Sequence, residues 1–291
     1  MNNAETRSSL THPSFDRRSW DRVYPGHLLT PPPITADIRR AAGDWLLNRS
    51  FLFPSEIIEQ REGAIEKAIG LMKGGYGLIV VFNHWSKRDP VEIFKSLEKL
   101  SEYFLHVPWH APVGRHQENL SLHIASAIWD VDLSLITTPS TIREMRRRGH
   151  KDWMPRREEI EKERKEYFDT AAQILGAPGI LSLSPWGTRH PKATQFKNEP
   201  LKKLVYEARE RGVTNVAFLP IGIGSKDRTT YEISGYNPRE KYILTVGECL
   251  AVEKIDPMNI DVTLHKKLLE VVPEGCRPQA PQESDAATAS E

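Results

Sequence analysis

The sequence predicts an α/β fold in which a largely parallel or mixed sheet is flanked by helices, with further helices at the N-terminal end. Short runs rich in valine, isoleucine and leucine alternate along the chain with segments whose apolar residues recur roughly every three to four positions. The runs are typical of strands buried on both faces, and the spaced segments are typical of amphipathic helices. Their alternation favours helices packed on a layer of largely parallel strands.

Helical spacing and apolar runs together assign most of the chain. The predicted helices cover 34–50, 54–75, 90–100, 118–130, 157–176, 197–212 and 259–272. The predicted strands cover 77–82, 103–107, 131–136, 179–184, 216–224 and 241–252. Pro54 and Ser55 suit the start of the second helix, and the glycine pair Gly74 and Gly75 suits its end. The charged residues before 157 are expected to form a connection.

Composition divides the chain into three regions. Residues 1–34 are polar, end in a triple proline and are expected to form an extended N-terminal arm. Residues 35–272 carry the alternating pattern and are expected to form a single α/β domain. Residues 273–291 have the composition of a disordered tail.

The charge balance and the cysteine content restrict the class of protein. The 291 residues carry a net charge of +1, so there is no basic excess to neutralise the phosphates of a nucleic acid. The two cysteines, Cys249 and Cys276, fit neither a metal motif nor a disulfide framework. The N-terminus lacks a secretory apolar segment, and no apolar run approaches the roughly 20 residues of a spanning helix. We therefore expect a cytoplasmic protein, either free or peripherally bound to a membrane.

A polar segment follows the apolar run at 77–82 and contains His84 and Asp89 in the pattern N-H-W-S-K-R-D-P. A histidine can remove a proton from an alcohol, and a carboxylate on its other ring nitrogen can orient it. No G-x-S-x-G motif precedes the pair, so the nucleophile would be a hydroxyl of the substrate. The alternative is that Asp89 caps a helix beginning at Pro90, with His84 an ordinary loop residue.

A second motif, S-P-W-G-T-R-H-P, follows the predicted strand at 179–184. Gly187 permits a tight turn beside Thr188, and the guanidinium of Arg189 suits a phosphate. Further donors follow at His190, Lys192 and Lys197. The alternative is a basic surface loop without a ligand.

In this order the two motifs resemble those of the glycerolipid acyltransferases, the superfamily of glycerol-3-phosphate and lysophosphatidate (1-acylglycerol-3-phosphate) acyltransferases. That family carries an N-H-x-x-x-x-D-P block and a later F-P-E-G-T-R or P-S-G-G-R block. A further apolar block containing a proline is similar to V-A-F-L-P-I-G-I at 216–223. The resemblance covers about residues 75–225, and it implies that 35–272 has the fold of a glycerol-3-phosphate acyltransferase.

The resemblance also implies the reaction and the roles of the motif residues. A fatty acyl group would move from an acyl-CoA or acyl carrier protein thioester to a hydroxyl of glycerol 3-phosphate or a lysophospholipid. His84 would act as general base and Asp89 as its partner, while Arg189 would hold the phosphate on a loop shaped by Gly187 and Thr188. No cofactor or metal would be needed. The alternatives are transfer to an acceptor without phosphate, or a non-catalytic homologue that binds an acyl chain or acyl carrier protein.

Both motifs depart from the family pattern by carrying a tryptophan. Trp186 replaces the glutamate of E-G-T-R, which the plastid-type enzymes also lack, and Trp85 directly follows His84. The two indoles are expected either to bind substrate, together with Lys197, or to serve as ordinary packing residues. The family's middle arginine block has no clean counterpart; Arg115 and Arg143 are the nearest candidates.

Two further clusters have a simple and a functional interpretation. His106, His110, His116 and His123 lie close in sequence, but prolines interrupt them, which favours loop histidines near the site over a metal centre. The basic run from Arg143 to Arg157 is expected to be either a solvated connection or a docking surface for an anion. Coenzyme A phosphates, an acidic acyl carrier protein or an anionic membrane would suit the second interpretation.

Overall fold

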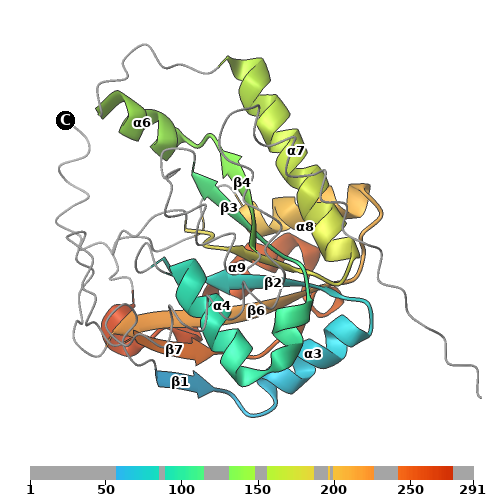
Figure 1. The fold of residues 1–291 in the computed structure, drawn as a ribbon, viewed down its shortest axis with the longest axis vertical. Coiled ribbons are helices and arrows are strands. Elements are labelled where there is room, and N and C mark those ends of the chain that lie inside the picture. The colour runs from blue at the N-terminus through green and yellow to red at the C-terminus, as the bar shows by residue number, and fades with distance from the viewer. Residues whose placement is uncertain are drawn as a thin grey trace, which may run out of the picture.

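A mixed eight-stranded sheet forms the centre of the protein (Figure 1). The structure, a computed structural model, describes residues 57–84, 89–114, 131–147, 156–186, 196, 199–225 and 242–277. The strands are β1 (Ile57–Gln60), β2 (Gly77–Phe82), β3 (Trp109–Gly114), β4 (Val131–Ile136), β5 (Ile180–Leu183), β6 (Val216–Ser225), β7 (Tyr242–Val246) and β8 (Leu250–Ala251).

The order across the sheet is β1-β7-β6-β2-β5-β3-β4, with β8 paired to β6. Strands β6, β2, β5, β3 and β4 all run in one direction, whereas β7 and β8 are antiparallel to β6, and β1 is parallel to β7. The predicted α/β class with a largely parallel or mixed sheet is therefore confirmed. The carboxyl ends of the parallel strands all lie at one edge, which is where ligand sites collect in such sheets.

Helices cover both faces of this sheet. Helix α4 (Asp89–Leu100), helix α3 (Ala64–Lys73) and the 3-10 segment η1 (Glu102–His106) lie on one face, where Phe94 of α4 meets Trp109 of β3 with ring centroids 5.0 Å apart. Helices α7 (Arg157–Gly176), α8 (Pro200–Glu210) and α9 (Ile260–Val271) lie on the other. Helix α6 (Pro139–Arg147) follows β4. Short 3-10 segments occupy Val252–Lys254, Pro257–Asn259 and Glu274–Cys276.

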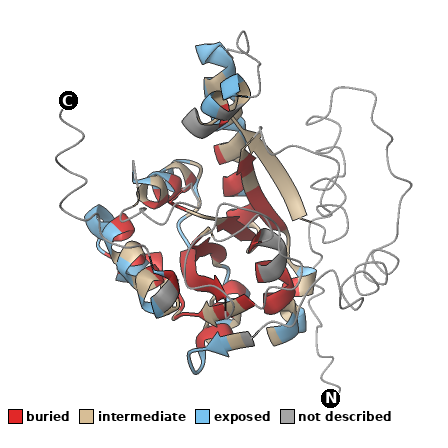
Figure 2. Ribbon diagram, turned by 90° about the vertical axis from the view of Figure 1, so that its left-hand side faces the viewer, coloured by how far each residue is buried: buried red, intermediate tan, exposed pale blue. Residues whose placement is uncertain are grey.

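The core lies between the sheet and the two helical layers. Every residue of β2 and of β6 is buried, as expected for strands covered on both faces. Figure 2 shows buried residues concentrated on the strands and on the inward sides of the helices, with exposed residues on their outer sides. None of the described helices is long and apolar enough to cross a membrane.

Most predicted elements within the described residues are confirmed, with small shifts at their ends. The confirmed helices are α4, α7, α8 and α9, and the confirmed strands are β2, β4, β5 and β6. The predicted arm at 1–34 and the predicted helices at 34–50 and 118–130 lie outside the described residues. The limits of the predicted domain therefore stay a prediction.

The single helix predicted over 54–75 is wrong. Ile57–Gln60 form β1, which pairs with the edge of β7, and α3 begins only at Ala64. Gly63 between them adopts a left-handed backbone with φ 70°, which interrupts any helix passing through it. Pairing with a distant strand therefore overrides the local helical spacing.

The strand predicted at 103–107 is also wrong. Those residues form η1, in which the Ser101 hydroxyl accepts a hydrogen bond from the backbone N–H of Tyr103, and Phe104 enters the core. The strand starts at Trp109, after Pro108, and includes Pro112. Pro112 is tolerated because the pairing of β3 with β5 stops at His110, and no other described strand pairs with that side of the backbone.

The strand predicted over 241–252 is broken into β7 and β8. Pro220 of β6 lies opposite the break, where Gly247 N–H donates to its carbonyl at 2.8 Å. Proline has no N–H to return this bond, so regular pairing cannot continue past it.

Two further predictions involve described residues. Part of the charged connection before 157 forms α6. Of the predicted disordered tail, residues 273–277 are described, and there Cys276 is buried and lies with Pro273 beside Gly224 of β6. Residues 278–291 lie outside the described residues.

Candidate active site

The two sequence motifs follow two neighbouring strands, β2 and β5. Val81 of β2 pairs in parallel with Leu183 of β5, and His84 and Trp186 stand at the same offset beyond these two residues. Because parallel strands end at the same edge, both motif segments leave the sheet side by side. This edge is the candidate active site.

His84 and Asp89 are in direct contact there. Nδ1 of His84 lies 2.7 Å from Oδ2 of Asp89, the carboxylate side chain is fully buried, and the imidazole is 18% exposed. Asp89 is the first residue of α4, where a negative charge is favoured by the helix dipole. The bond orients the ring so that Nδ1–H donates to the carboxylate and Nε2 is left as the basic nitrogen. The catalytic roles of the two residues stay predictions.

Asn83 joins the end of β2 to β6. Its carboxamide donates to the Ile223 carbonyl at 2.7 Å and accepts from the Ile223 N–H at 2.6 Å. The side chain is buried directly after β2, a strand of apolar residues and glycine. The sequence analysis assigned no role to Asn83, although an asparagine directly after a fully apolar strand is a signal that it satisfies backbone groups.

Trp186 is buried, and its predicted role in substrate binding stays a prediction. Its ring meets Phe196 and His265 of α9 edge to face, with centroids 5.8 and 5.7 Å away. Phe196 and His265 also meet each other, at 5.0 Å. Burial lowers the pKa of His265 below its usual range. Neither the indole N–H of Trp186 nor Nδ1 of His265 has a hydrogen-bond partner among the described residues.

The other predicted binding residues lie outside the described residues, so their positions stay predictions: Trp85, Gly187, Thr188, Arg189 and Lys197. The flanking His190, Lys192 and Arg115 fall outside as well. Trp186 and Phe196, which are described, stand on either side of the segment that contains the G-T-R motif. Phe196 and His265 were not foreseen, because nothing in their local sequence links them to that motif.

The histidine cluster does not form a metal centre within the part of the chain that the structure describes. There, no three histidine, cysteine, aspartate or glutamate side chains gather as metal ligands would. His110 is a buried residue of β3 rather than a loop residue, with its ring stacked on Tyr167 of α7 at 6.3 Å. Its nearest carboxylate oxygen, on Asp132, is 3.7 Å from Nδ1, and burial raises the pKa of Tyr167.

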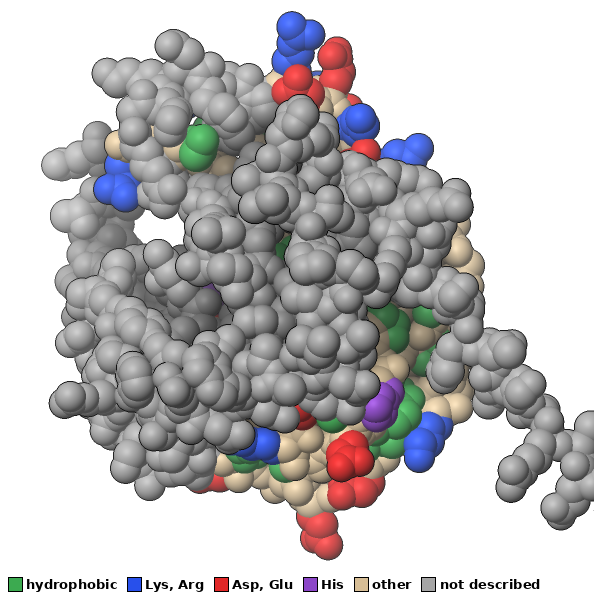
Figure 3. Space-filling view, viewed as in Figure 1, with side chains coloured by type: hydrophobic (Ala, Val, Ile, Leu, Met, Phe, Trp, Pro, Cys, Tyr) green, Lys and Arg blue, Asp and Glu red, His purple; other side chains and the backbone are tan. Residues whose placement is uncertain are grey.

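The excess of positive charge in the basic run does not continue into α7, where acidic residues accompany the basic ones. Arg143 is exposed on α6, and Arg157 begins α7 in an ion pair with Glu161 at 2.8 Å. Figure 3 shows acidic and basic side chains interspersed over the end of the molecule where α7 begins. The residues between α6 and α7 are not described, so the docking interpretation of the run stays a prediction.

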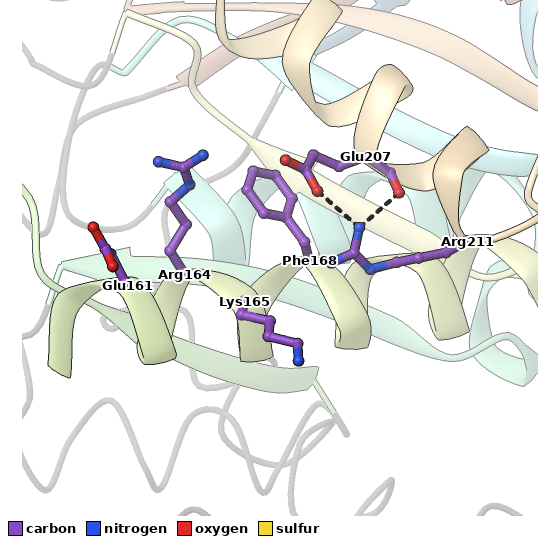
Figure 4. A pocket seen from close by; sticks show the side chains of 6 residues that line it. All are labelled: Glu161, Arg164, Lys165, Phe168, Glu207 and Arg211. Atoms are coloured by element: carbon purple, nitrogen blue, oxygen red, sulfur yellow. Dashed lines mark hydrogen bonds and ion pairs between the residues drawn. The ribbon is translucent and has the colours of Figure 1, made fainter. Parts of the chain in front are cut away.

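A hollow of about 290 Å³ lies between α7 and α8 (Figure 4). The guanidinium groups of Arg164 and Arg211 lie 5.8 and 5.9 Å from the ring centroid of Phe168. Arg211 is held by Asp169 and Glu207 at 2.7 and 2.8 Å. The lining carries Arg164, Lys165 and Arg211 against Glu161 and Glu207, and Asp169 also binds Arg211, so little net charge is left to attract an anion. The hollow lies where α8 ends, before β6 starts, whereas the dyad follows the end of β2.

Comparison with known proteins finds a likeness among solved structures. No protein-family model and no curated protein sequence matches the chain. Among solved structures, the chain is similar to the 1-acyl-sn-glycerophosphate (LPA) acyltransferase PlsC from Thermotoga maritima, with 16% identity and a TM-score of 0.45. The match covers 86% of this chain and 83% of that one.

Proposed function

We propose that this protein is an acyltransferase that moves a fatty acyl group from an acyl-CoA or acyl carrier protein thioester to a hydroxyl group. The observation that carries the proposal is the 2.7 Å contact between a partly exposed histidine and a fully buried aspartate at the carboxyl edge of the sheet. A buried carboxylate behind an imidazole stabilises the cation that forms when the ring takes a proton.

The proposed reaction uses this arrangement. Nε2 of His84 removes the proton of the acceptor hydroxyl as its oxygen attacks the thioester carbonyl carbon. The tetrahedral intermediate collapses, the carbon–sulfur bond breaks, and the imidazolium returns the proton to the departing thiolate. Asp89 keeps its negative charge throughout and holds the ring in the tautomer that has a basic Nε2.

A phosphorylated acceptor, either glycerol 3-phosphate or a lysophospholipid, is the proposed substrate class. The support is the G-T-R motif in the sequence, which comes after β5, the strand that pairs with β2 ahead of His84. Under this proposal the planar guanidinium group of Arg189 binds the phosphate, with Gly187, Thr188 and Lys197 around it. Anchoring the phosphate on one segment would hold the hydroxyl near His84, which is catalysis mainly by positioning.

The test is release of free thiol from acyl-CoA and acyl carrier protein thioesters in the presence of purified protein and a panel of acceptors. His84→Ala is expected to abolish transfer to every acceptor, and full activity in this variant would contradict the proposal. Arg189→Ala is expected to raise the KM for glycerol 3-phosphate or lysophospholipid without affecting an acceptor that lacks phosphate. Arg209→Ala, on the exposed side of α8, is the matched control and should behave as wild type.

The same assay separates the two alternatives. An unchanged acceptor KM in Arg189→Ala would favour an acceptor without phosphate. Binding of acyl carrier protein or acyl-CoA without thiol release from any donor would favour a non-catalytic binding protein.

A further inference from the structure

At the end of β2, the side chain of Asn83 takes the place of backbone pairing with β6. The last paired residues of β2 and β6 are Phe82 and Ile221. Beyond them, the carboxamide of Asn83 makes two hydrogen bonds with the N–H and the carbonyl of Ile223, at 2.6 and 2.7 Å. The side chain therefore continues the ladder for one more step where the main chain of β2 turns away.

Asparagine meets the requirements of this position. Ile223 presents one donor and one acceptor toward β2, so the side chain opposite must supply one acceptor and one donor on a short stem. Aspartate lacks the donor, and an apolar residue of similar size lacks both groups. With Asn83 at 2% exposure, either change would leave a backbone group of Ile223 buried without a partner.

The two hydrogen bonds between Asn83 and Ile223, which we call the Asn83 clamp, also restrict the residue that follows Asn83 in the chain. The peptide bond after Asn83 leads directly to His84, so anchoring the Asn83 side chain to β6 restricts the backbone direction in which the imidazole leaves the sheet. The other partner of the contact, Asp89, is held separately by α4. The 2.7 Å distance between Nδ1 and Oδ2 thus depends on two independent supports, β6 through Asn83 and α4 through Asp89.

We infer that Asn83 is a positioning residue, which holds the His84 ring against Asp89 by clamping the end of β2 to Ile223 of β6. The geometric part of this inference is independent of the reaction, whereas its kinetic part rests on the proposed acyl transfer. The two parts are therefore tested by separate measurements.

The geometric test is proton NMR of the imidazole. Wild type should show a low-field Nδ1–H resonance from the His84–Asp89 bond, assigned by its loss in His84→Ala. Asn83→Leu, which has the same branched shape, removes both hydrogen-bonding groups of the Asn83 side chain and should lose or broaden the signal through exchange with water. Ser182→Ala is the matched control: it removes another buried hydrogen bond of the sheet, from Trp109 Nε1 at 3.0 Å, and should keep the signal.

A folded Asn83→Leu with an unchanged resonance would overturn the inference. If Asn83→Leu does not fold, Asn83→Ser retains a hydroxyl that can pair with one of the two Ile223 groups. Its Nδ1 proton should then exchange with water faster than in wild type, and an unchanged exchange rate would overturn the inference.

The kinetic test uses thiol release. Asn83→Leu, or Asn83→Ser in its place, should lower kcat by about 10²-fold with acceptor KM unchanged, because misplacement by roughly an ångström has that effect on a reacting group. A kcat within about twofold of wild type would overturn the inference. If wild type transfers no acyl group to any acceptor, the proposed function fails, and the NMR measurement still decides whether Asn83 positions His84.

Discussion

His84 and Asp89 meet where β2 ends and α4 begins, with Nδ1 of the imidazole 2.7 Å from Oδ2 of the carboxylate. The carboxylate is fully buried and the ring is partly exposed. Burial of one partner and exposure of the other means that the pair is accessible from one side only, through the histidine.

Replacing Asp89 by asparagine should lower kcat by about 10³- to 10⁴-fold with little change in acceptor KM. The amide can donate a hydrogen bond to Nδ1, which stabilises the tautomer whose Nε2 carries the proton and is no longer a base; the aspartate-to-asparagine change in serine proteases acts in this way. The measurement is thiol release with saturating donor. Activity within tenfold of wild type, in a protein with an unchanged Tm, would show that Asp89 does not orient the base.

Trp186→Phe should leave stability and acceptor KM nearly unchanged. Phenylalanine keeps the edge contacts with Phe196 and His265, and it removes a buried indole N–H that has no partner among the described residues. We expect a change in the free energy of unfolding of less than about 1.5 kcal/mol, against a loss of about 3–5 kcal/mol for Trp186→Ala. Denaturant unfolding measures both. A Phe variant of normal stability but greatly raised KM would instead make Trp186 a substrate-binding residue.

His265 should make the protein less stable in mild acid. Burial lowers its pKa, so the folded state binds fewer protons than the unfolded state at pH values just below the ordinary histidine pKa of about 6.5. The free energy of unfolding therefore falls as pH falls through this window, and it is regained on returning to neutral pH. Denaturant unfolding of wild type and His265→Phe at several pH values measures the effect. As pH falls through this window, the free energy of unfolding should fall more in wild type than in His265→Phe. A difference between the two proteins that does not change with pH would contradict the prediction.

Gly222→Ala should destabilise the fold, whereas Gly70→Ala should stabilise it. A Cβ at Gly222 would collide with the backbone carbonyl of Val271 in α9, so the helix or the strand must move. A Cβ at Gly70, within α3, meets no neighbouring atom. We expect the free energy of unfolding to fall by about 1–3 kcal/mol or more in Gly222→Ala and to rise by up to about 1 kcal/mol in Gly70→Ala. Thermal unfolding compares them, and equal Tm values would show that α9 does not press on β6.

Local sequence was sufficient for elements whose pattern and environment agree. The run Gly77–Phe82 was predicted as a doubly buried strand because it contains only apolar residues and glycine, and every one of its residues is buried. Helix α7 was predicted from its spacing over 157–176 and has those bounds. The pair His84 and Asp89 was a predicted candidate because a histidine and an aspartate five positions apart come after such a strand.

Long-range pairing decided the elements that the sequence analysis missed. Ile57–Gln60 became a strand because the edge of β7 offered unpaired backbone groups, which no local pattern reveals. The break between β7 and β8 depends on Pro220, a residue remote in sequence that lacks the N–H needed opposite Gly247.

By itself, the sequence determined the α/β class, the main strands and helices, and the two motifs that each follow a strand, since each of these depends on periodicity and residue order. The tertiary structure decided which distant groups support those motifs: Ile223 for Asn83, and His265 with Phe196 for Trp186. Such partners depend on sheet order, register and helix packing. These arise from the free energy of the whole fold and leave no mark on the residues beside each motif.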